Sequence, residues 1–473
     1  MRRLRRANKP YVLLAIAVFC FAITAYFSFS EEKHLRNLDI NSFVSWEKTD
    51  TVMDQLADQI YKDIPVSQSK YVGTYKQMQT TEGKKITQEP ATVLPIDEIE
   101  RRFNERKGLL QEACVKYKRY NPICERKTAG FNYKYVNESN LVYCAIEKTG
   151  STLWKRILHV IGGWSNSSNP TSIKSEAADT YHGGFETLEN STMDEMQEIF
   201  NNSDSIMFVR DPFTRLFSAW LDKLYSPNHY YWTNIGPLIV KSERLSKEEW
   251  NASHVFCASD ISFTEFINFT IKEVTFKMCA DGHFSPSHKH CLPCLIPFDY
   301  IGKYETFKED TTYLLNKLNL SHKVTFDDFE TDAARDAIRD STEWVFSQKE
   351  KLLECNVTFH CALFKVWNRM QSRGFLSTKI KFPFESVDEV KNVTKDDIIS
   401  VLTKAYRESD PNETKGNRME ALRQAFQHLP SKLRTRLVLA FKVDFAMFGY
   451  DRNPEYLNKP LQTSFNYFKE CQE

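Results

Sequence analysis

The sequence predicts an α/β domain with a central parallel sheet flanked by helices. Two apolar runs, Leu141–Ile146 and Ser205–Val209, have the length and composition of buried strands. Each run precedes a segment whose apolar residues recur at helical spacing. Strand–turn–helix units repeated in this way are typical of parallel sheets, whose ligands bind at the carboxyl ends of the strands.

The turn after the first predicted strand is a candidate anion site. The helix that follows it has one apolar stripe and should end at Gly162-Gly163. Amides at a helix N-terminus point at an anion, Gly150 lets the backbone approach closely, and Lys148 adds a charge. Ser151 and Thr152 add hydroxyl donors. The alternative is an ordinary helix start with a surface lysine. The turn is not a nucleoside-triphosphate P-loop, because no glycine precedes its lysine at the required spacing.

A second candidate anion site follows the second predicted strand, which ends at Arg210. Asp211 can cap the next helix, with Pro212 at the first helical position. Thr214 and Ser218 lie one turn apart, away from the apolar stripe. An arginine at the strand end and a hydroxyl on the helix can bind a phosphate from two sides. The alternative is that Arg210 pairs with a carboxylate such as Asp211.

The first thirty residues predict a membrane anchor. Residues 1–10 carry five basic side chains, and residues 11–30 carry no charge over a length that spans a bilayer core. Basic residues before the span keep the N-terminus cytoplasmic and the remainder lumenal. The alternative is a cleaved signal peptide, since Ala22-Ile23-Thr24-Ala25 resembles a cleavage site. Either case sends the chain into the secretory pathway, where its ten Asn-x-Ser/Thr sequons beyond residue 30 can be glycosylated.

The chain thus divides into five predicted segments: a cytoplasmic tail (1–10), a signal anchor (11–30), a lumenal stem (31–105), a catalytic domain (106–455) and a C-terminal tail (456–473). The net charge of +1 gives no support for a nucleic-acid-binding surface, and we expect no nucleic-acid partner. The oligomeric state is left open, a homo-oligomer included.

Ten of the eleven cysteines follow the predicted anchor, an even number that suits disulfides in an oxidising lumen. Candidate local pairs are Cys355 with Cys361 and Cys114 with Cys124. One cluster of thiols and imidazoles would also fit zinc: Cys279, His288, His290, Cys291 and Cys294. The oxidising compartment favours disulfides over a metal there, and we expect no metal.

Four sequence blocks resemble the Golgi carbohydrate sulfotransferases, in the branch that includes the HNK-1, chondroitin 4-O and dermatan 4-O enzymes. "KTGSTLWKRIL" (148–158) resembles their 5′-phosphosulfate loop, and "VRDPFTRLFSAWLDK" (209–223) resembles their 3′-phosphate segment. "HFSPSHKHCLPCLIPFDYIGKYETFKED" (283–310) and "VDFAMFGY" (443–450) agree in order and spacing. The resemblance covers about residues 130–451 and implies the P-loop-like sulfotransferase fold.

The resemblance also implies a reaction: sulfate passes from 3′-phosphoadenylyl sulfate (PAPS) to a hydroxyl of a glycan acceptor, with a glycosaminoglycan such as chondroitin or dermatan as the favoured acceptor. The enzyme would be a single-pass type II protein of the Golgi membrane and would need no metal. Lys148 would be catalytic and stabilise charge on the leaving oxygen. His283 is the general-base candidate, with His182 second. The implied donor contacts are Lys148, Thr149, Gly150, Ser151, Thr152, Leu153, Arg210, Asp211, Thr214 and Ser218.

One departure from the family pattern concerns the turn that carries Lys148 and Gly150, which we call the donor turn. Glu147 stands directly before Lys148, where the family usually has proline. If it faced inward, its charge would weaken anion binding. Glu147 therefore favours a competing hypothesis, a lumenal glycan-binding protein without activity. A different lumenal glycan enzyme, such as a kinase or glycosyltransferase, and a sulfotransferase for an N-glycan or heparan also stay open. The resemblance is weakest between residues 165 and 192 and between 225 and 279, where we expect the acceptor site.

Three smaller expectations complete the predicted domain. Four basic residues near the two anion sites could help to bind an anionic acceptor, or could be surface charges: Lys155, Arg156, Arg215 and Lys223. Thr306 and Glu309 should form a capping box. The aromatic residues of "VDFAMFGY" should belong to the core.

Overall fold

The computed structural model describes residues 95–471, apart from 118–129, 180–182, 247–248, 250–254, 276–280 and 327. The predicted cytoplasmic tail, the anchor and most of the stem lie outside the described residues, as do Cys124, His182 and Cys279. Within the described ranges, no helix combines the length and the apolar character needed to cross a membrane.

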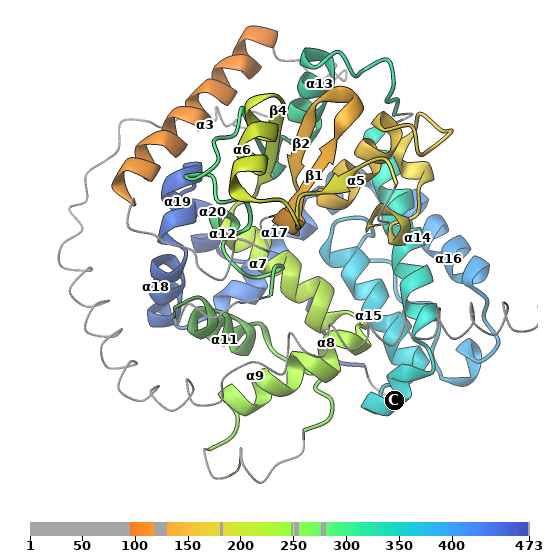
Figure 1. Cartoon of the computed structure of the whole chain (residues 1–473). Coiled ribbons are helices and arrows are strands. Elements are labelled where there is room, and N and C mark those ends of the chain that lie inside the picture. Colours follow the sequence, from red (N-terminus) through yellow and green to blue (C-terminus); the bar gives the residue numbers. More distant parts are fainter. Residues whose placement is uncertain are drawn as a thin grey trace, which may run out of the picture. The chain divides into compact units, whose positions relative to one another are not determined.

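A five-stranded mixed sheet with the order β3-β1-β2-β4-β5 forms the centre (Figure 1). Its strands are β1 (Tyr133–Val136), β2 (Leu141–Cys144), β3 (Glu186–Thr187), β4 (Asp204–Val209) and β5 (Tyr300–Lys303). β2, β4 and β5 are parallel, whereas β1 pairs antiparallel with β2 and β3. Both predicted strands are confirmed, but the sheet is not wholly parallel. The link from β1 to β2 is a short turn, and such a link can join only antiparallel strands.

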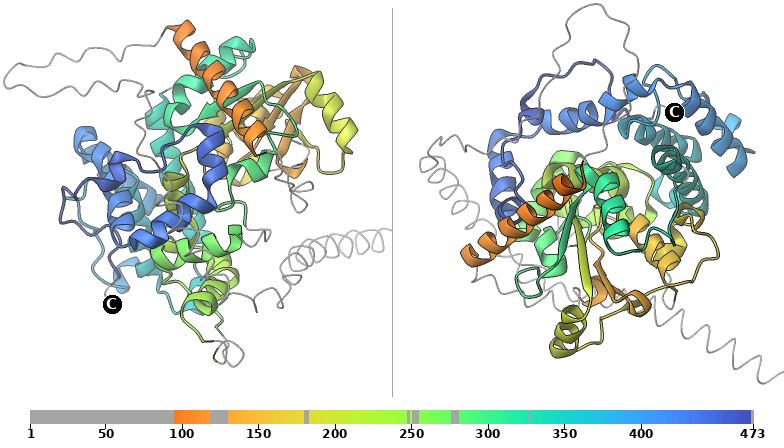
Figure 2. Two further views of the ribbon diagram at one scale, coloured as in Figure 1. Left: turned by 90° about the vertical axis from the view of Figure 1, so that its left-hand side faces the viewer. Right: turned by 90° about the horizontal axis from the view of Figure 1, so that it is seen from above.

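Helices cover the sheet and extend beyond it. Their bounds are α3 (Ile96–Lys116), α5 (Ser151–Ile161), α6 (Met193–Asn201), α7 (Pro212–Trp220), α8 (His229–Asn234), α9 (Gly236–Glu243), α11 (Phe263–Thr275), α12 (Ser287–Cys291), α13 (Phe307–Lys317), α14 (Phe329–Ser347), α15 (Phe359–Ser372), α16 (Lys395–Glu408), α17 (Pro411–Gln427), α18 (Ser431–Ala440), α19 (Lys442–Phe448) and α20 (Glu455–Asn458). One π-helical turn, η5 (Leu221–Tyr225), continues α7. Helices of residues 329–427 gather to one side of the strands (Figure 2, cyan to blue).

The helices that follow the two predicted strands start where the sequence places them. α5 begins at Ser151, directly after Gly150, and ends before Gly162. α7 begins at Pro212, and the Asp211 carboxylate accepts a hydrogen bond from the Thr214 amide at 2.9 Å. The capping box at Thr306 is wrong, because the Thr306 hydroxyl donates to Asp310 Oδ2 instead (2.7 Å).

Four disulfides link distant parts of the described chain: Cys114–Cys294, Cys144–Cys291, Cys257–Cys355 and Cys361–Cys471. The candidate local pairs, Cys355 with Cys361 and Cys114 with Cys124, are therefore wrong. Each of these described cysteines pairs with a partner at least 98 residues away, because packing brings the partners together and spacing along the chain does not. Cys291 and Cys294 are oxidised, so neither offers a thiolate to zinc.

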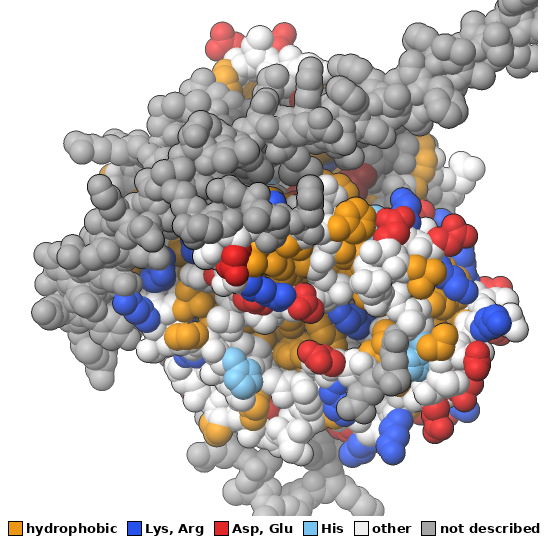
Figure 3. All heavy atoms as spheres, turned by 90° about the horizontal axis from the view of Figure 1, so that it is seen from below, with side chains coloured by type: hydrophobic (Ala, Val, Ile, Leu, Met, Phe, Trp, Pro, Cys, Tyr) orange, Lys and Arg blue, Asp and Glu red, His pale blue; other side chains and the backbone are white. Residues whose placement is uncertain are grey.

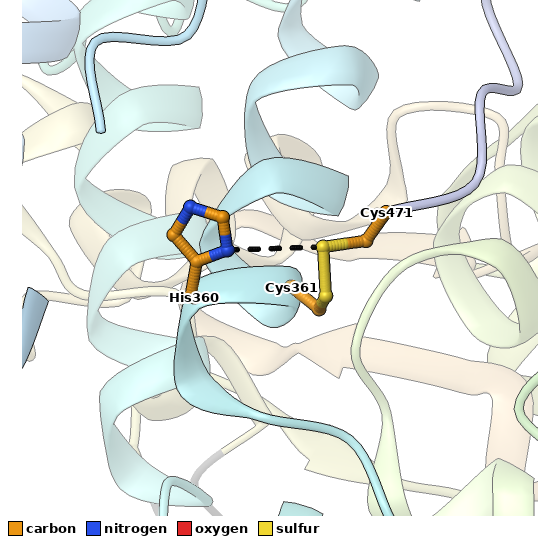
Figure 4. Close-up of side chains that lie close together, drawn as sticks. All are labelled: His360, Cys361 and Cys471. Atoms are coloured by element: carbon orange, nitrogen blue, oxygen red, sulfur yellow. Dashed lines mark hydrogen bonds between the residues drawn. A yellow bond between two sulfur atoms is a disulfide. The ribbon is translucent and has the colours of Figure 1, made fainter. Parts of the chain in front are cut away.

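The Cys361–Cys471 bridge connects the start of α15 to the C-terminal segment, beside His360 (Figure 4). Nδ1 of His360 lies 3.8 Å from Sγ of Cys471. His360 and these two cysteines form a close group of potential metal ligands. Because both sulfurs are in the bridge, the group is a structural link in this state and has no thiolate for a metal.

Two segments expected outside the catalytic domain pack onto it. α3 starts at Ile96, within the predicted stem, and the stem residues Ile99 and Phe103 are buried in the core. Arg106, the first residue of the predicted catalytic domain, is also buried in α3 and donates to Asp310 Oδ2 (2.7 Å) and to the Ile301 carbonyl (3.0 Å). Within the predicted tail, Tyr467 is buried and Cys471 is bridged to α15. Phe445 and Phe448 are buried, as predicted for the "VDFAMFGY" block.

The solvent-exposed surface of the domain carries both basic and acidic side chains. On the face shown in Figure 3, Lys and Arg side chains are interspersed with Asp and Glu side chains among the described residues. This pattern agrees with the balanced overall charge. A strongly cationic region at the ends of the strands, described below, is thus a local feature.

We predict that Asp310→Ala lowers the free energy of unfolding by about 3–5 kcal/mol, because it leaves the buried Arg106 guanidinium without its carboxylate. Urea unfolding of the full-length chain measures the change. Glu309→Ala is the matched control, since it removes only a half-exposed partner of Arg102 and should cost less than about 1 kcal/mol. Equal losses in the two variants would contradict the prediction.

Candidate active site

The three parallel strands end at one edge of the sheet and bring three side chains together. Lys148 lies in the turn after β2, Arg210 follows β4 directly, and Tyr304 follows β5 directly. Arg210 Nη1 donates to the Lys148 carbonyl at 3.1 Å, and the guanidinium lies 4.3 Å from the centroid of the Tyr304 ring. The two anion sites proposed from the sequence are therefore neighbours.

The turn before α5 contains two residues with positive φ, one of which is not a glycine. Lys148 (φ 67°) and Gly150 (φ 91°) are both left-handed. A Cβ at Gly150 would lie 2.4 Å from a ring carbon of Phe307, so a side chain does not fit there. The amides of Leu153 and Trp154 donate to the Gly150 carbonyl (3.1 and 3.3 Å), whereas those of Ser151 and Thr152 precede the first intrahelical bonds and are available to an anion. The Thr149 hydroxyl donates to the Ile146 carbonyl (2.8 Å), so it holds the turn.

Lys148 lies in a network of charges centred on Asp222, in the π-helical turn η5. Its Nζ is 2.7 Å from Asp222 Oδ2, and the same carboxylate binds Arg369 and lies 3.6 Å from Lys223. Burial lowers the pKa of Lys148 to about 8, although Asp222 opposes the shift. Burial alone would raise the pKa of Asp222, but Lys148, Arg369 and Lys223 hold it well below the usual range.

Four cationic side chains act on the Tyr304 phenol. Arg418 lies 5.1 Å from its ring centroid, and Arg210 lies against the same ring. The charge of Arg418, with those of Arg210, Arg373 and Lys148, lowers the pKa of Tyr304 to about 7 in spite of burial. Such a concentration of positive charge suits a ligand with several negative charges.

Sequence reasoning missed Arg369 on α15, Arg373 at the C-cap of α15 and Arg418 on α17. In the sequence, these three arginines lie more than 140 residues after Lys148 and Arg210. No motif or residue spacing identifies them as site residues. Only the packing of these helices against the strand ends brings them to the site.

Arg215 joins the donor turn to the loop that carries His283. The buried guanidinium donates to three carbonyl oxygens: Glu147 (2.9 Å), Ser285 (2.5 Å) and Gly282 (2.8 Å). These contacts are structural, so Arg215 is not available to an acceptor. Its role is to hold the His283 loop beside the Lys148 turn.

His283 is oriented by two neighbours. Its Nδ1 lies 2.8 Å from Asp281 Oδ1 and 2.9 Å from the Tyr231 hydroxyl, which donates to Asp281 Oδ2 at 2.9 Å. Because both contacts involve Nδ1, Nε2 is the nitrogen suited to accept a proton from a substrate. Asp281 stays ionised: burial opposes this, but His283 lowers its pKa to about 2.

Glu147, the departure from the family pattern, faces away from the donor turn. Its Oε2 lies 3.2 Å from Nδ1 of His290, and its carboxylate packs against Gly282. Burial disfavours its charge, yet His290, His283 and Arg215 lower its pKa overall. Glu147 is absent from the residues that line the groove at Lys148.

Two further basic residues proposed for the acceptor are engaged elsewhere. Lys155 pairs with Asp179, and the buried Arg156 donates to Asp336 (2.6 Å). Lys223 alone of the four proposed basic residues lines the groove. Its Nζ lies 5.1 Å from the centroid of the Tyr231 ring.

The groove beside Lys148 has a volume of about 440 Å³. Gly150, Thr152 and Leu153 line it from the donor turn and α5, and Arg369 lines it from α15. Thr214 and Ser218 are half-buried on α7, where Arg210 Nε donates to the Thr214 hydroxyl (3.0 Å). Of the predicted site residues, Lys148, Gly150, Thr152 and Leu153 line the groove, whereas Arg210, Thr214, Ser218 and His283 do not.

Comparison with known proteins agrees with this geometry. Residues 132–361 match the model of the sulfotransferase family. Human (Homo sapiens) carbohydrate sulfotransferase 9 is 31% identical over 230 residues, which cover 48% of this chain and 50% of that protein. Human carbohydrate sulfotransferase 8 is 30% identical over 244 residues (50% and 55%), and carbohydrate sulfotransferase 11 of Rattus norvegicus is 28% identical over 191 residues (40% and 53%).

The matched region spans about half the length of these relatives. The resemblance to carbohydrate sulfotransferases is confirmed, and the family model covers three of the four sequence blocks; the block at 443–450 lies beyond it. No solved structure matches the chain significantly.

We predict that Asp222→Asn lowers the pKa of Lys148 below its present value of about 8, because the carboxylate that favours the ammonium is lost. The neutral amine should then form at lower pH. Amine-reactive labelling of Lys148 across pH 5–10, read by mass spectrometry, measures the titration. Lys174, an exposed lysine outside the groove, is the internal control. An unchanged Lys148 curve would show that Asp222 does not support its charge.

Proposed function

We propose that this chain is a carbohydrate O-sulfotransferase that uses PAPS as the sulfate donor and a glycan hydroxyl as the acceptor. The observation that carries the proposal is the convergence of four cationic side chains on Tyr304, where three parallel strands end beside the start of α5. PAPS has two separated anionic groups, and the two adjacent anion sites suit them. The names of the relatives support a carbohydrate acceptor.

In this proposal, the donor turn holds the 5′-phosphosulfate through Lys148 and the amides and hydroxyls of Ser151 and Thr152. Arg210, with hydroxyls of α7, holds the 3′-phosphate. Asp211 caps α7, and the Tyr456 hydroxyl donates to its Oδ1 (2.8 Å), which keeps the helix start in place below the phosphate. Fixing both ends of the donor sets the direction in which its sulfur can be attacked.

In the reaction, the acceptor oxygen forms a bond to sulfur while the bond from sulfur to the bridging phosphate oxygen breaks. The Lys148 ammonium stabilises the negative charge that develops on that oxygen. His283 Nε2 accepts the proton of the acceptor hydroxyl, and Asp281 stabilises the resulting imidazolium. The products are the sulfated glycan, adenosine 3′,5′-bisphosphate and a proton.

The finer assignments rest on the sequence resemblance. A chondroitin or dermatan acceptor, a single-pass Golgi membrane anchor and a metal-free reaction are part of the proposal. The rival hypothesis, a glycan-binding protein without activity, loses its main support because Glu147 lies against His290 (3.2 Å) and does not line the groove.

The first test is donor binding. Adenosine 3′,5′-bisphosphate at 100 times its Kd should stabilise the full-length chain by about 2.7 kcal/mol, seen as a higher Tm. Arg210→Ala should abolish most of this shift, because it removes the 3′-phosphate contact. Arg335→Ala, which alters an exposed arginine of α14, should bind like the unaltered chain. No shift at millimolar ligand would refute the donor site.

The second test is catalysis. Lys148→Ala should reduce transfer of labelled sulfate to a glycan by a factor of about 10²–10³, since it removes a charge that acts in the transition state. His283→Ala should cost about 10²–10⁴. His322→Ala, which alters an exposed histidine, is the control. Full activity in a folded Lys148→Ala variant would end the proposal.

A further inference from the structure

A second cavity of the described domain lies beside the first half of α15, separate from the groove at Lys148. It has a volume of about 710 Å³, and no residue lines both it and the groove. Aromatic side chains from four segments line it: Trp220 (α7), Tyr225 (η5), Phe263 (α11) and Phe468 of the C-terminal segment. The centroid of the half-buried Phe468 ring lies 5.0 Å from that of Trp220 and 5.6 Å from that of Tyr225. The cavity thus has an aromatic wall that the proposed reaction does not use.

The charged groups of this cavity balance. Lys365 and Lys469 line it together with Asp260 and Glu470. Lys365 Nζ donates to the Ser259 carbonyl (2.8 Å), and burial lowers the pKa of Lys365 to about 8, a shift that Asp260 and Glu470 oppose. Because the charges cancel, the cavity favours a neutral ligand over a strongly charged one. Its polar side chains can form hydrogen bonds with the hydroxyl and amide groups of such a ligand.

One residue at this cavity is a potential attachment site for a sugar. Asn356 lines the cavity and begins the sequon Asn356-Val357-Thr358. It is exposed and left-handed (φ 54°) between η7 (Lys351–Cys355) and α15, and its side-chain amide makes no hydrogen bond within the described residues. The sequon at Asn268 differs, because the Asn268 amide donates to Glu243 Oε2 at 2.6 Å. The folded domain therefore leaves room for a glycan at Asn356 and holds the Asn268 amide in place.

Glycosylation of Asn356 would place a neutral sugar directly at the aromatic wall. In the secretory pathway, a bond forms between Asn356 Nδ2 and C1 of N-acetylglucosamine, the bond from C1 to the diphosphate of a lipid carrier breaks, and the amide loses one proton. The first sugars of such a glycan are uncharged. Their apolar ring faces can stack on aromatic side chains, and their hydroxyl and acetamide groups form hydrogen bonds. A short covalent link gives them a millimolar effective concentration, so even weak binding is enough to fill the cavity.

We propose that Asn356 carries an N-linked glycan whose first N-acetylglucosamine residue occupies this cavity and stacks on Phe468. The inference goes beyond the proposed function and requires only that the chain enters the secretory pathway. The docked sugar contacts both the start of α15 and the C-terminal segment, next to the Cys361–Cys471 bridge, which also lines the cavity (Figure 4). The glycan is thereby part of the packing of the domain and stabilises it.

The chain contains a matched control site. Asn392 begins the sequon Asn392-Val393-Thr394, which has the same three residue types, and it is also exposed. In both sequons the threonine is the N-cap of the helix that follows: Thr358 caps α15 and Thr394 caps α16. Asn392 lines neither the groove nor this cavity. The two sites therefore differ in what lies beside the asparagine. The exposed sequon at Asn319 is the reference if Asn392 is unmodified.

The test uses the full-length chain made in cultured animal cells. Peptide:N-glycosidase F, an amidase that cleaves the link between asparagine and the first sugar, is added to the folded protein, and glycopeptide mass spectrometry follows both sites. Release at Asn356 should be slower than at Asn392 by a factor of about ten or more, because the docked sugar must first leave the cavity. After unfolding and reduction of the disulfides, the two rates should agree within about twofold.

Variants locate the effect at the cavity. Phe468→Leu keeps an apolar side chain but removes the stacking ring, and it should speed release at Asn356 about three- to tenfold. Thr264→Trp, in the first turn of α11, fills the cavity and should bring release at Asn356 to the rate at Asn392. Neither variant should alter release at Asn392. Asn356→Gln should lower the Tm by about 2 °C or more, whereas Asn392→Gln should change it by less than about 1 °C.

Several results would overturn the inference. One is an unmodified Asn356 on a chain that is glycosylated at Asn392 or Asn319, and another is equal release at Asn356 and the reference site on the folded protein. Unchanged slow release at Asn356 in a folded Thr264→Trp variant would place the protection outside the cavity. A chain without any modified sequon would refute the inference together with the lumenal location. The sulfotransferase function is tested separately, by the effect of adenosine 3′,5′-bisphosphate on the Tm.

Discussion

The site depends on one buried guanidinium. Arg215, on α7, donates to backbone carbonyls on both sides of the site: that of Glu147 in the donor turn and those of Gly282 and Ser285 in the histidine loop. A buried arginine is stable only when its donors are satisfied, so these loops must take up a fixed arrangement around it. The helix that carries Arg215 starts just after Arg210, with Asp211 as its cap. One helix therefore sets the positions of Arg210, the turn that carries Lys148 and the loop that carries His283.

Local structure around the strand ends could be predicted because its signals are local. An apolar run, a capping aspartate with proline after it, and a glycine that lets the backbone approach closely each act within a few residues, and all are present in the structure. The adjacency of Lys148 and Arg210 follows from the parallel pairing of β2 and β4, since parallel strands end at the same edge.

Contacts between distant segments could not be predicted in the same way. Three cationic residues come to the site from helices whose packing no sequence motif predicts: Arg369, Arg373 and Arg418. The predicted disulfide partners are wrong for the same reason. The sequence shows the charge of Arg215, which led to the prediction that it helps to bind an anionic acceptor. It does not show the three carbonyl oxygens to which the guanidinium donates. The direction in which Glu147 points depends on His290, which lies far along the chain.

The Cys361–Cys471 bridge has a consequence for maturation of the protein. It links the C-terminal segment covalently to the first turn of α15, and the Cys257–Cys355 bridge links the segment just before that helix to Cys257. Arg369 and Arg373 lie at the far end of the same helix and its cap. A newly made chain in a reducing compartment would lack both disulfides. The positions of Arg369 and Arg373 beside Asp222 are thereby coupled to the formation of these two disulfides.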